Sequence, residues 1–143
     1  MRVAAIDLGS RRIGVAVSDG SGTLATPRCT VERSGDPEAD RARVVAVVLE
    51  AEAGRLVVGL PLSLDGRRRR AAVAAESEAT ALRTLLAARG VEVETFDERF
   101  TTVSAERSLA AAGRVGGARR KVVDQAAAAV LLQAWLDAQP PAR

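Results

Sequence analysis

Hydrophobic residues near the N-terminus form short runs separated by turn residues, a pattern typical of β-strands. Residues 2–8 and 12–18 are apolar almost throughout, and each run predicts a buried strand. A third strand is predicted over residues 23–32, where Pro27 favours an edge position because proline lacks a backbone donor. The short connections between these segments predict an antiparallel meander.

Helical periodicity begins after the third strand. Asp36 is a suitable helix cap and Pro37 a suitable first helical residue, and the helix is expected to reach about Ala53. Its apolar stripe consists of Val44, Val47, Val48 and Ala51. We expect Gly54 to end this helix.

The remaining chain alternates strands and helices, without a linker or an internal repeat. Strands are predicted over residues 55–60 and 91–97, and helices over about 71–89, 101–112 and 121–138. In the first of these helices, the apolar stripe consists of Leu82, Leu85 and Leu86. Residues 61–70 and 114–120 are predicted to be loops. This order predicts a mixed α/β sheet with right-handed crossovers, in a single domain spanning residues 1–143.

Composition excludes several classes of chemistry. The chain is 48% hydrophobic and 27% charged, as globular proteins are, and lacks the run of about 18 apolar residues that a membrane span needs. Histidine is absent and Cys29 is the only cysteine, which excludes a structural zinc site, a Ser-His-Asp triad and a Cys-His pair. A lone cysteine and the lack of a signal peptide are expected of a cytoplasmic protein. Carboxylates, hydroxyls, basic groups and a hard metal ion remain.

Positive charge is concentrated in two segments, although the formal net charge is only +3. One cluster consists of Arg67, Arg68, Arg69 and Arg70, and the other of Arg114, Arg119, Arg120 and Lys121. Neither contains an acidic residue, and the rest of the chain is net acidic. Such segments either bind a polyanion or are simply solvated loops.

Two strand ends carry acidic residues that interrupt the apolar pattern. Asp7 ends the first strand, where it either faces a ligand or caps the turn. Asp97 and Glu98 end the last strand, either as part of a site or as solvated charges. Because side chains alternate along a strand, only one of these two can face the same side as Asp7.

The last helix contributes a third acidic position, Asp124. It shares one face of the helix with Ala128, Leu131 and Trp135, and that face is predicted to turn toward the core. An acid so early in a helix is either a ligand or a capping device.

Carboxylates from two strand ends and one helix would form a single cleft if the strands are parallel neighbours. Without histidine or cysteine, this donor set favours a hard cation, Mg²⁺ or Mn²⁺, as one or two ions. Two such ions about 4 Å apart activate water and stabilise the leaving oxygen in phosphodiester hydrolysis.

Four motifs resemble those of one protein family. Residues 5–19 read AIDLGSRRIGVAVSD, residues 59–66 GLPLSLDG, and residues 97–106 DERFTTVSAE. The last helix carries Lys121, Asp124, Ala126-Ala127, Leu131-Leu132 and Leu136-Asp137. In this order, and over nearly the whole chain, the motifs resemble the YqgF/RuvX family of RNase H-like nucleases. The chain departs from the family pattern at Ala5, which replaces a glycine, and in the four arginines after Gly66.

The resemblance implies an RNase H-like fold: a mixed five-stranded sheet of order 3-2-1-4-5, with strand 2 antiparallel, flanked by helices. It implies a catalytic and metal-binding triad of Asp7, Glu98 and Asp124. Candidate phosphate contacts are Arg11, Arg99, Lys121 and the other residues of the basic segments, namely Arg67, Arg68, Arg69, Arg70, Arg119 and Arg120. The alternative role for Arg99 is a structural ion pair with Asp97.

Members of that family are described as Holliday junction resolvases and as nucleases that process the 5′ end of pre-16S rRNA. The expected function is therefore a metal-dependent endonuclease on structured nucleic acid, working as a monomer or homodimer. The sequence does not distinguish precursor rRNA from branched DNA, because both are contacted through phosphates.

Two other classes of function compete with this expectation. A phosphotransferase of the actin and sugar-kinase kind also begins with D-x-G on a strand, but it needs a second such domain, for which 143 residues leave no room. A non-catalytic RNA-binding module for ribosome assembly is the other. One Trp, two Phe and no Tyr leave that module few rings for base stacking.

Overall fold

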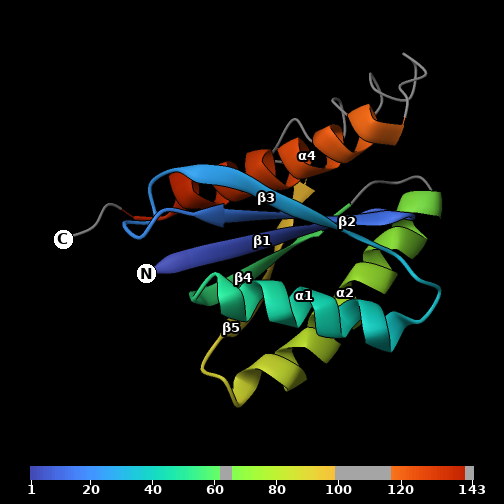
Figure 1. Cartoon of the computed structure of the whole chain (residues 1–143), viewed down its shortest axis with the longest axis horizontal. Helices are drawn as coiled ribbons and strands as arrows, with labels where there is room; N and C mark the ends of the chain where they lie inside the picture. Colours follow the sequence, from blue (N-terminus) through green and yellow to red (C-terminus); the bar gives the residue numbers. More distant parts are fainter. Residues whose placement is uncertain (62–65, 99–116, 141–143) are drawn as a thin grey trace.

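Five strands form one mixed sheet in the computed structural model, which describes residues 1–61, 66–98 and 117–140 (Figure 1). For residues 66–68 and 117–124 it describes the backbone alone. The strands are β1 (Arg2–Leu8), β2 (Arg12–Ser18), β3 (Ala25–Glu32), β4 (Ala53–Leu60) and β5 (Glu92–Asp97). Their order is β3-β2-β1-β4-β5, with β2 antiparallel to its neighbours and with β1, β4 and β5 parallel. This confirms the predicted sheet order.

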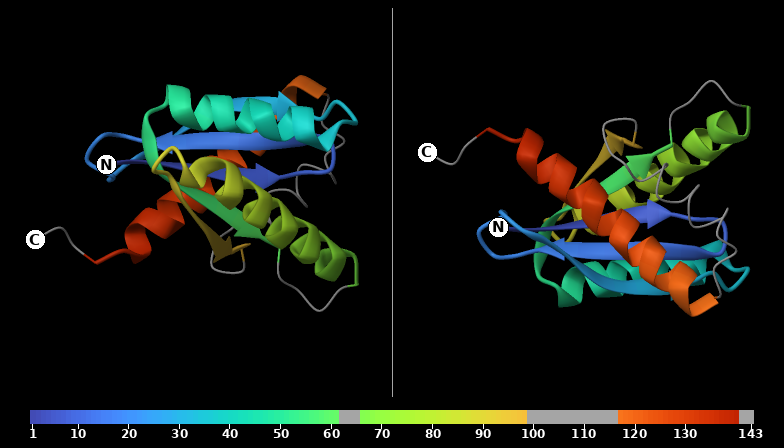
Figure 2. Two further views of the ribbon diagram at one scale, coloured as in Figure 1. Left: turned by 90° about the horizontal axis from the view of Figure 1, so that it is seen from below. Right: turned by 90° about the horizontal axis from the view of Figure 1, so that it is seen from above.

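Helices cover both faces of the sheet (Figure 2). α1 (Pro37–Glu50) and α2 (Gly66–Ala87) pack on one face, and α4 (Gly117–Ala138) crosses the other. The helix predicted over residues 101–112 lies outside the described residues. In the ranges that the structure describes, no helix is both long and apolar enough to cross a membrane.

Side-chain alternation on the central strand β1 divides the core into two layers. Ala4 and Ile6 pack with α1 and α2, whereas Val3 and Ala5 pack with α4. The same alternation turns Asp7 toward the α4 side. The last core position of β1 on that side is therefore a carboxylate.

The edge position predicted for the third strand is confirmed, and α4 holds this strand in place. Gln133 Oε1 accepts a hydrogen bond from Ala25 N at 2.9 Å, and Gln133 Nε2 donates to Thr23 O at 3.0 Å. β3 begins at Ala25 rather than at residue 23 because the Asp19 carboxylate accepts hydrogen bonds from Thr23 N and Leu24 N. These bonds make the two residues part of the turn.

The predicted end of the first helix is wrong by a few residues. α1 ends at Glu50, and β4 already begins at Ala53. Glu52 adopts a positive φ of 56°, a left-handed conformation that ends a helix without glycine. Gly54 lies inside β4 instead.

The loops predicted at the basic segments, residues 61–70 and 114–120, are wrong from residue 66 and from residue 117 onward. α2 begins at Gly66, so residues 67–70 form its first turn, and α4 begins at Gly117, so Arg119 and Arg120 are helical. Arginine is a good helix former, which allows both helices to begin within the charge clusters.

The stripe predicted on α2 is wrong at Leu85, which is 50% exposed. The buried face of the helix consists of Ala72, Ala75, Ala79, Leu82 and Leu86.

Candidate active site

The carboxyl ends of β1, β4 and β5 bring Asp7, Gly59 and Glu98 to one edge of the sheet. In the β1–β4 register Ile6 lies opposite Val58, so the residues that follow, Asp7 and Gly59, are neighbours. Glu98 comes directly after β5, which pairs with β4 on its other side. The two acidic residues therefore flank one glycine.

Gly59 leaves room for the Glu98 side chain. A Cβ atom at this position would lie 2.9 Å from Glu98 Oε1 and 2.9 Å from Leu131 Cδ2, closer than such atoms normally approach. The Glu98 carboxylate therefore extends from β5 over β4, beneath α4. Two strand spacings separate β5 from β1 by about 10 Å, and the Glu98 side chain covers part of that gap.

Both acidic residues are buried: Asp7 is 1% exposed and Glu98 2% exposed. Burying a carboxylate opposes folding unless hydrogen bonds or cations compensate for its lost hydration. Both residues have contacts in the structure. Asp7 Oδ1 and Glu98 Oε2 are nevertheless buried oxygens that accept no hydrogen bond from the described part of the chain. Two buried carboxylates on either side of one glycine suit a hard divalent cation.

The third predicted carboxylate, Asp124, lies on α4, and its side chain is outside the described residues. The core-facing stripe predicted for this helix is confirmed at Ala128, Leu131 and Trp135, which are all buried. Leu131, which approaches Gly59, lies about two helical turns after Asp124. Within the described side chains no group of three metal-binding residues comes together. The structure thus describes the surroundings of two members of the predicted triad.

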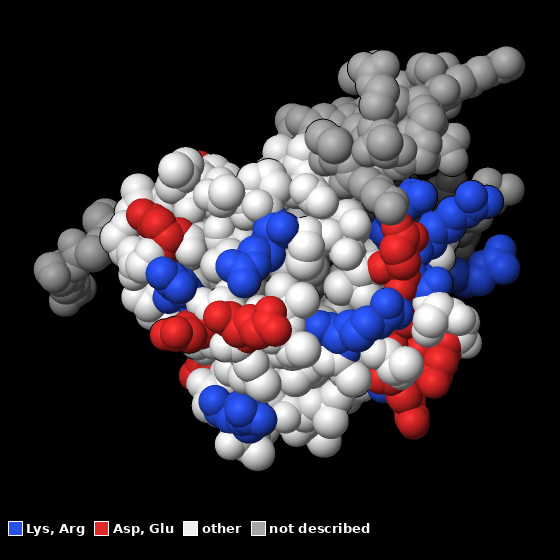
Figure 3. Space-filling view, viewed as in Figure 1, with Lys and Arg blue, Asp and Glu red and all other residues white. Residues whose placement is uncertain are grey.

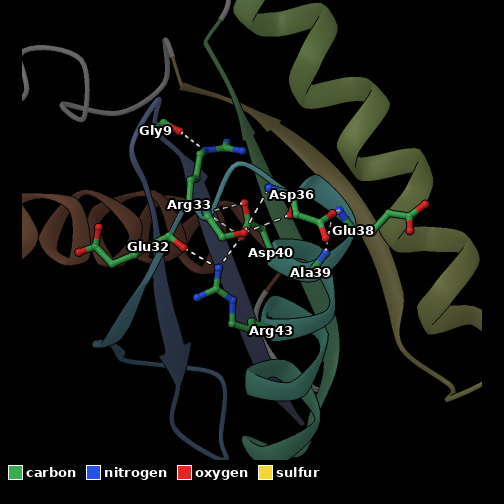
Figure 4. Close-up of polar contacts among 9 residues, drawn as sticks. Gly9, Glu32, Arg33, Asp36, Glu38, Ala39, Asp40 and Arg43 are labelled. Carbon is green, nitrogen blue, oxygen red and sulfur yellow. Dashed lines mark hydrogen bonds and ion pairs between the residues drawn. The ribbon is translucent and has the colours of Figure 1, made fainter.

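The turn that follows Asp7 is fixed from two sides. Gly9 N donates to Arg12 O at 2.9 Å, and a Cβ atom at Gly9 would lie 2.6 Å from the same oxygen, so glycine is required there. Arg33 Nε donates to Gly9 O at 2.7 Å (Figure 4). Sequence reasoning missed Arg33, whose only signal was its position directly after a strand that ends at this edge.

Other acidic residues close to this turn stabilise the start of α1 (Figure 4). Asp36 caps the helix by accepting hydrogen bonds from two backbone N–H groups of its first turn. Asp40 is buried, accepts a hydrogen bond from Ser34 Oγ at 2.7 Å and pairs with Arg43. The Ser34 hydroxyl and the Arg43 guanidinium hold the pKa of Asp40 below its usual range. These two carboxylates therefore have structural partners already.

The first turns of α2 and α4 lie at the carboxyl edge of the sheet. α2 begins soon after the end of β4. α4 passes Gly59 at Leu131, and at Trp135 it reaches Arg55, near the start of β4, so its first turn points the other way. In Figure 3, Lys and Arg side chains gather on the right, where β1 and β3 end in Figure 1, with acidic side chains among them.

The predicted phosphate contacts lie at this edge as far as they are described. Arg11 is exposed in the β1–β2 turn, and Arg69 and Arg70 are exposed on the first turn of α2. The backbone alone places Arg67, Arg68, Arg119, Arg120 and Lys121 on the first turns of α2 and α4. Arg99 lies outside the described residues.

Comparison with known proteins identifies one protein family. Residues 1–138 match the RuvX family, described as Holliday junction resolvase. A protein of Myxococcus xanthus (strain DK1622) named "Putative pre-16S rRNA nuclease" is 45% identical over 141 residues, which are 99% of this chain and 91% of that protein. A protein of the same name from Rhodococcus erythropolis (strain PR4 / NBRC 100887) is 47% identical over 139 residues, covering 95% of this chain and 77% of the relative.

A solved structure shares the fold. The structure "T. thermophilus RuvC in complex with Holliday junction substrate" matches with a TM-score of 0.60 and 19% identity, over 96% of this chain and 94% of that one. The mixed sheet with helices on both faces is thus the RNase H-like sheet of RuvC, as predicted.

Proposed function

This chain belongs to the RuvX family and is a nuclease, a hydrolase of phosphodiester bonds, and from this premise we propose that it is a divalent-metal-dependent endonuclease that processes the 5′ end of precursor 16S rRNA. The choice of substrate is supported by the names of two relatives, each at least 45% identical over nearly the whole chain. A precursor rRNA substrate and a lone, partly buried Cys29 both favour a cytoplasmic location.

The burial of Asp7 and Glu98 on either side of Gly59 is the observation that carries this proposal. Together with Asp124, they are the residues that would hold one or two Mg²⁺ or Mn²⁺ ions. Bound there, such ions would activate water for attack on phosphorus and stabilise the leaving oxygen. Asp7 lies in β1 and Glu98 directly follows β5, and both strands pair with β4, so their carboxylates are held in place before any ligand arrives.

Basic residues around these carboxylates would bind the substrate. The first turns of α2 and α4 contain no acidic residue. Cations at a helix N-terminus oppose the helix dipole, so these clusters are unfavourable unless an anion neutralises them. Nucleic-acid phosphates at the carboxyl edge of the sheet would supply that anion. We assign this role to Arg11, Arg99 and Lys121 and to residues 67–70, 119 and 120.

One experiment tests both activity and substrate. A 5′-extended 16S rRNA and a four-way DNA junction are incubated with the protein side by side, with Mg²⁺ and with EDTA. We expect Mg²⁺-dependent cleavage near the mature 5′ end of the rRNA and little cleavage of the junction. Cleavage in EDTA, or no cleavage of either substrate by folded protein, would contradict the proposal.

Resolution of Holliday junctions is the second candidate function. It is favoured by the family description and by the fold shared with a resolvase solved on its junction substrate. Symmetric cleavage of a four-way junction requires two active sites and hence a homodimer. Junction cleavage by a protein that sediments as a dimer would favour this candidate over the rRNA.

A further inference from the structure

An open groove of about 560 Å³ lies beside the turn that follows Asp7. It is lined by residues 10–12 of the β1–β2 turn and by the connection from β3 into α1. β3 runs parallel to β1, since both are antiparallel to β2, so the groove lies at the same edge of the sheet as Asp7 and Glu98. It continues that edge across β2 and β3, on the side away from β5.

The lining of the groove contains more arginines than carboxylates. Arg12 pairs with Glu32 at 3.2 Å, and Asp40 pairs with Arg43. Both carboxylates of the lining are thus matched by an arginine. Arg11 and Arg33 are the remaining cations, and neither forms an ion pair within the described residues.

Arg33 is held through one nitrogen of its guanidinium group. Its Nε donates to Gly9 O at 2.7 Å, which restrains the guanidinium (Figure 4). Its terminal nitrogens donate to no group in the part of the chain that the structure describes. The Arg11 side chain is exposed and likewise has no hydrogen-bond partner there. An anchored guanidinium loses less freedom than a mobile one when it binds a phosphate.

We infer that this groove binds backbone phosphates of the nucleic-acid strand next to the scissile bond, with Arg11 and Arg33 as the contacts. The inference rests on the proposed function and specifies the path of the substrate past Asp7. The described lining contains no aromatic side chain for base stacking, so the contact is with the backbone and is independent of sequence. Through the Gly9 carbonyl, Arg33 joins the bound phosphate to the turn after Asp7.

The inference is tested by the salt dependence of binding. Affinity for a labelled single-stranded RNA of 20 nucleotides is measured in EDTA by fluorescence anisotropy at several salt concentrations. Each lost phosphate contact on a single strand reduces the slope of log K against log salt by about 0.7, so Arg11→Gln with Arg33→Gln should reduce it by about 1.4. Arg11→Gln alone should reduce it by about 0.7.

A matched control removes the same charge from the opposite edge. Arg2 donates to a backbone carbonyl, Ala51 O at 3.4 Å, as Arg33 does. Arg89, like Arg11, is exposed and makes no such contact with the residues that the structure describes. Arg2→Gln with Arg89→Gln should leave the slope close to that of the unmodified protein. Arg33→Gln also removes a hydrogen bond to the turn, so the single Arg11 variant serves as the test without that complication.

The outcomes separate this inference from the proposed function. Equal slopes for the Arg11 and Arg33 double variant and the control, in a protein that binds RNA and cleaves with Mg²⁺, would overturn the groove as a binding site and the phosphate contact assigned to Arg11, and would leave the proposed activity standing. A protein that neither binds nor cleaves any of the nucleic acids would overturn the proposed function. An equal loss of slope in both double variants would mean that net charge acts at a distance, and would also overturn the groove as a specific site.

Discussion

At the scale of single residues, Asp7 and Glu98 are charged side chains where the surrounding core is apolar. Asp7 follows Val3 and Ala5 on the same side of β1, and each of the three is buried. An apolar residue would pack there without loss of hydration, so these carboxylates serve something other than stability. The neighbouring acid Asp97 is only partly buried and provides the natural comparison.

Separate substitutions of the neighbours Asp97 and Glu98 test which of the two carboxylates serves the site. Glu98→Gln should abolish cleavage, because it removes a charge from the buried pair while keeping the side chain's shape. Asp97→Asn should retain most activity and lower the melting temperature slightly. Cleavage rates and thermal melts of both variants decide the matter. If Asp97→Asn were inactive and Glu98→Gln active, the side of the strand assigned to each residue would be wrong.

Asp19 belongs to the first motif but serves the β2–β3 turn. Hydrogen bonds from the Ser21 hydroxyl and from the N–H groups of Leu24 and Thr23 lower its pKa from 3.8 to about 2. A lowered folded pKa means stability that is present above about pH 4 and is lost as pH falls toward 2. Melting temperatures between pH 5 and pH 2.5 should therefore fall more steeply for the unmodified protein than for Asp19→Asn. Parallel curves would contradict this.

At the scale of elements, the sequence predicted the strands and the start of α1 better than the starts of α2 and α4. The ranges predicted for the first two strands are those of β1 and β2, because apolar runs bounded by turn residues mark both ends. The first turn of α2 was obscured by its arginines, which resemble a loop, and by alanines such as Ala72 and Ala75, which carry little apolar contrast. Charged residues and alanines show little apolar periodicity, so the sequence does not reveal this helix start, although backbone hydrogen bonds and close packing form it.

The site was predictable in part for similar reasons. The alternation of strands and helices predicts parallel strands and the family resemblance implies their order, and together these bring Asp7 and Glu98 to one edge. The role of Gly59 does not, because a close approach between β4 and a side chain from beyond β5 depends on tertiary packing. The hydrogen bond from Arg33 to Gly9 is equally invisible in sequence, since 24 positions separate its partners.

The space beside Gly59 should be too small for a methyl group. Gly59→Ala places a Cβ atom 2.9 Å from Glu98 Oε1 and from Leu131 Cδ2, so the Glu98 side chain must shift. Overpacking of this kind costs about 1–3 kcal/mol of unfolding free energy, and displacing a catalytic group by about 1 Å costs about 100-fold in rate. Gly20→Ala is the control, because a Cβ atom there meets nothing within 4 Å. Unchanged turnover in Gly59→Ala would show that Glu98 need not lie over β4.

The first turn of α2 should favour binding at the expense of helix stability. Glutamine is the appropriate replacement for residues 67–70, because it forms helices about as well as arginine but carries no charge. The quadruple variant should flatten the salt slope for duplex nucleic acid by up to about 3–4 units, at about 0.9 for each lost contact. Its melting temperature should not fall, since each removed cation relieves an unfavourable interaction of about 0.3–1 kcal/mol with the helix dipole. An unchanged slope would identify the arginines as solvated charges.

At the scale of the whole molecule, charge and backbone direction are organised about one edge of the sheet. β1, β3, β4 and β5 all end there, and α1, α2 and α4 all begin there (Figures 1 and 2). Helix starts carry partial positive charge and thereby raise the potential around the two buried carboxylates. Structural ion pairs occur at both edges, such as Arg12 with Glu32 at this one and Arg55 with Glu92 and Glu94 at the opposite one. A polyanion and a divalent cation would both be drawn to the first edge.

This organisation predicts that a divalent cation stabilises the folded protein. A ligand that binds only the folded state stabilises it by about 2.7 kcal/mol at 100 times its Kd, which for a chain of this size raises the melting temperature by about 10 °C. Mg²⁺ should therefore raise the melting temperature of the unmodified protein and of Asp97→Asn. Asp7→Asn should be inactive and should melt at or above the temperature of the metal-free unmodified protein. Mg²⁺ should raise its melting temperature little, because the variant lacks one of the two buried charges. A Mg²⁺-dependent rise of equal size in Asp7→Asn would show that the ion binds elsewhere, and cleavage by that variant would remove Asp7 from the mechanism.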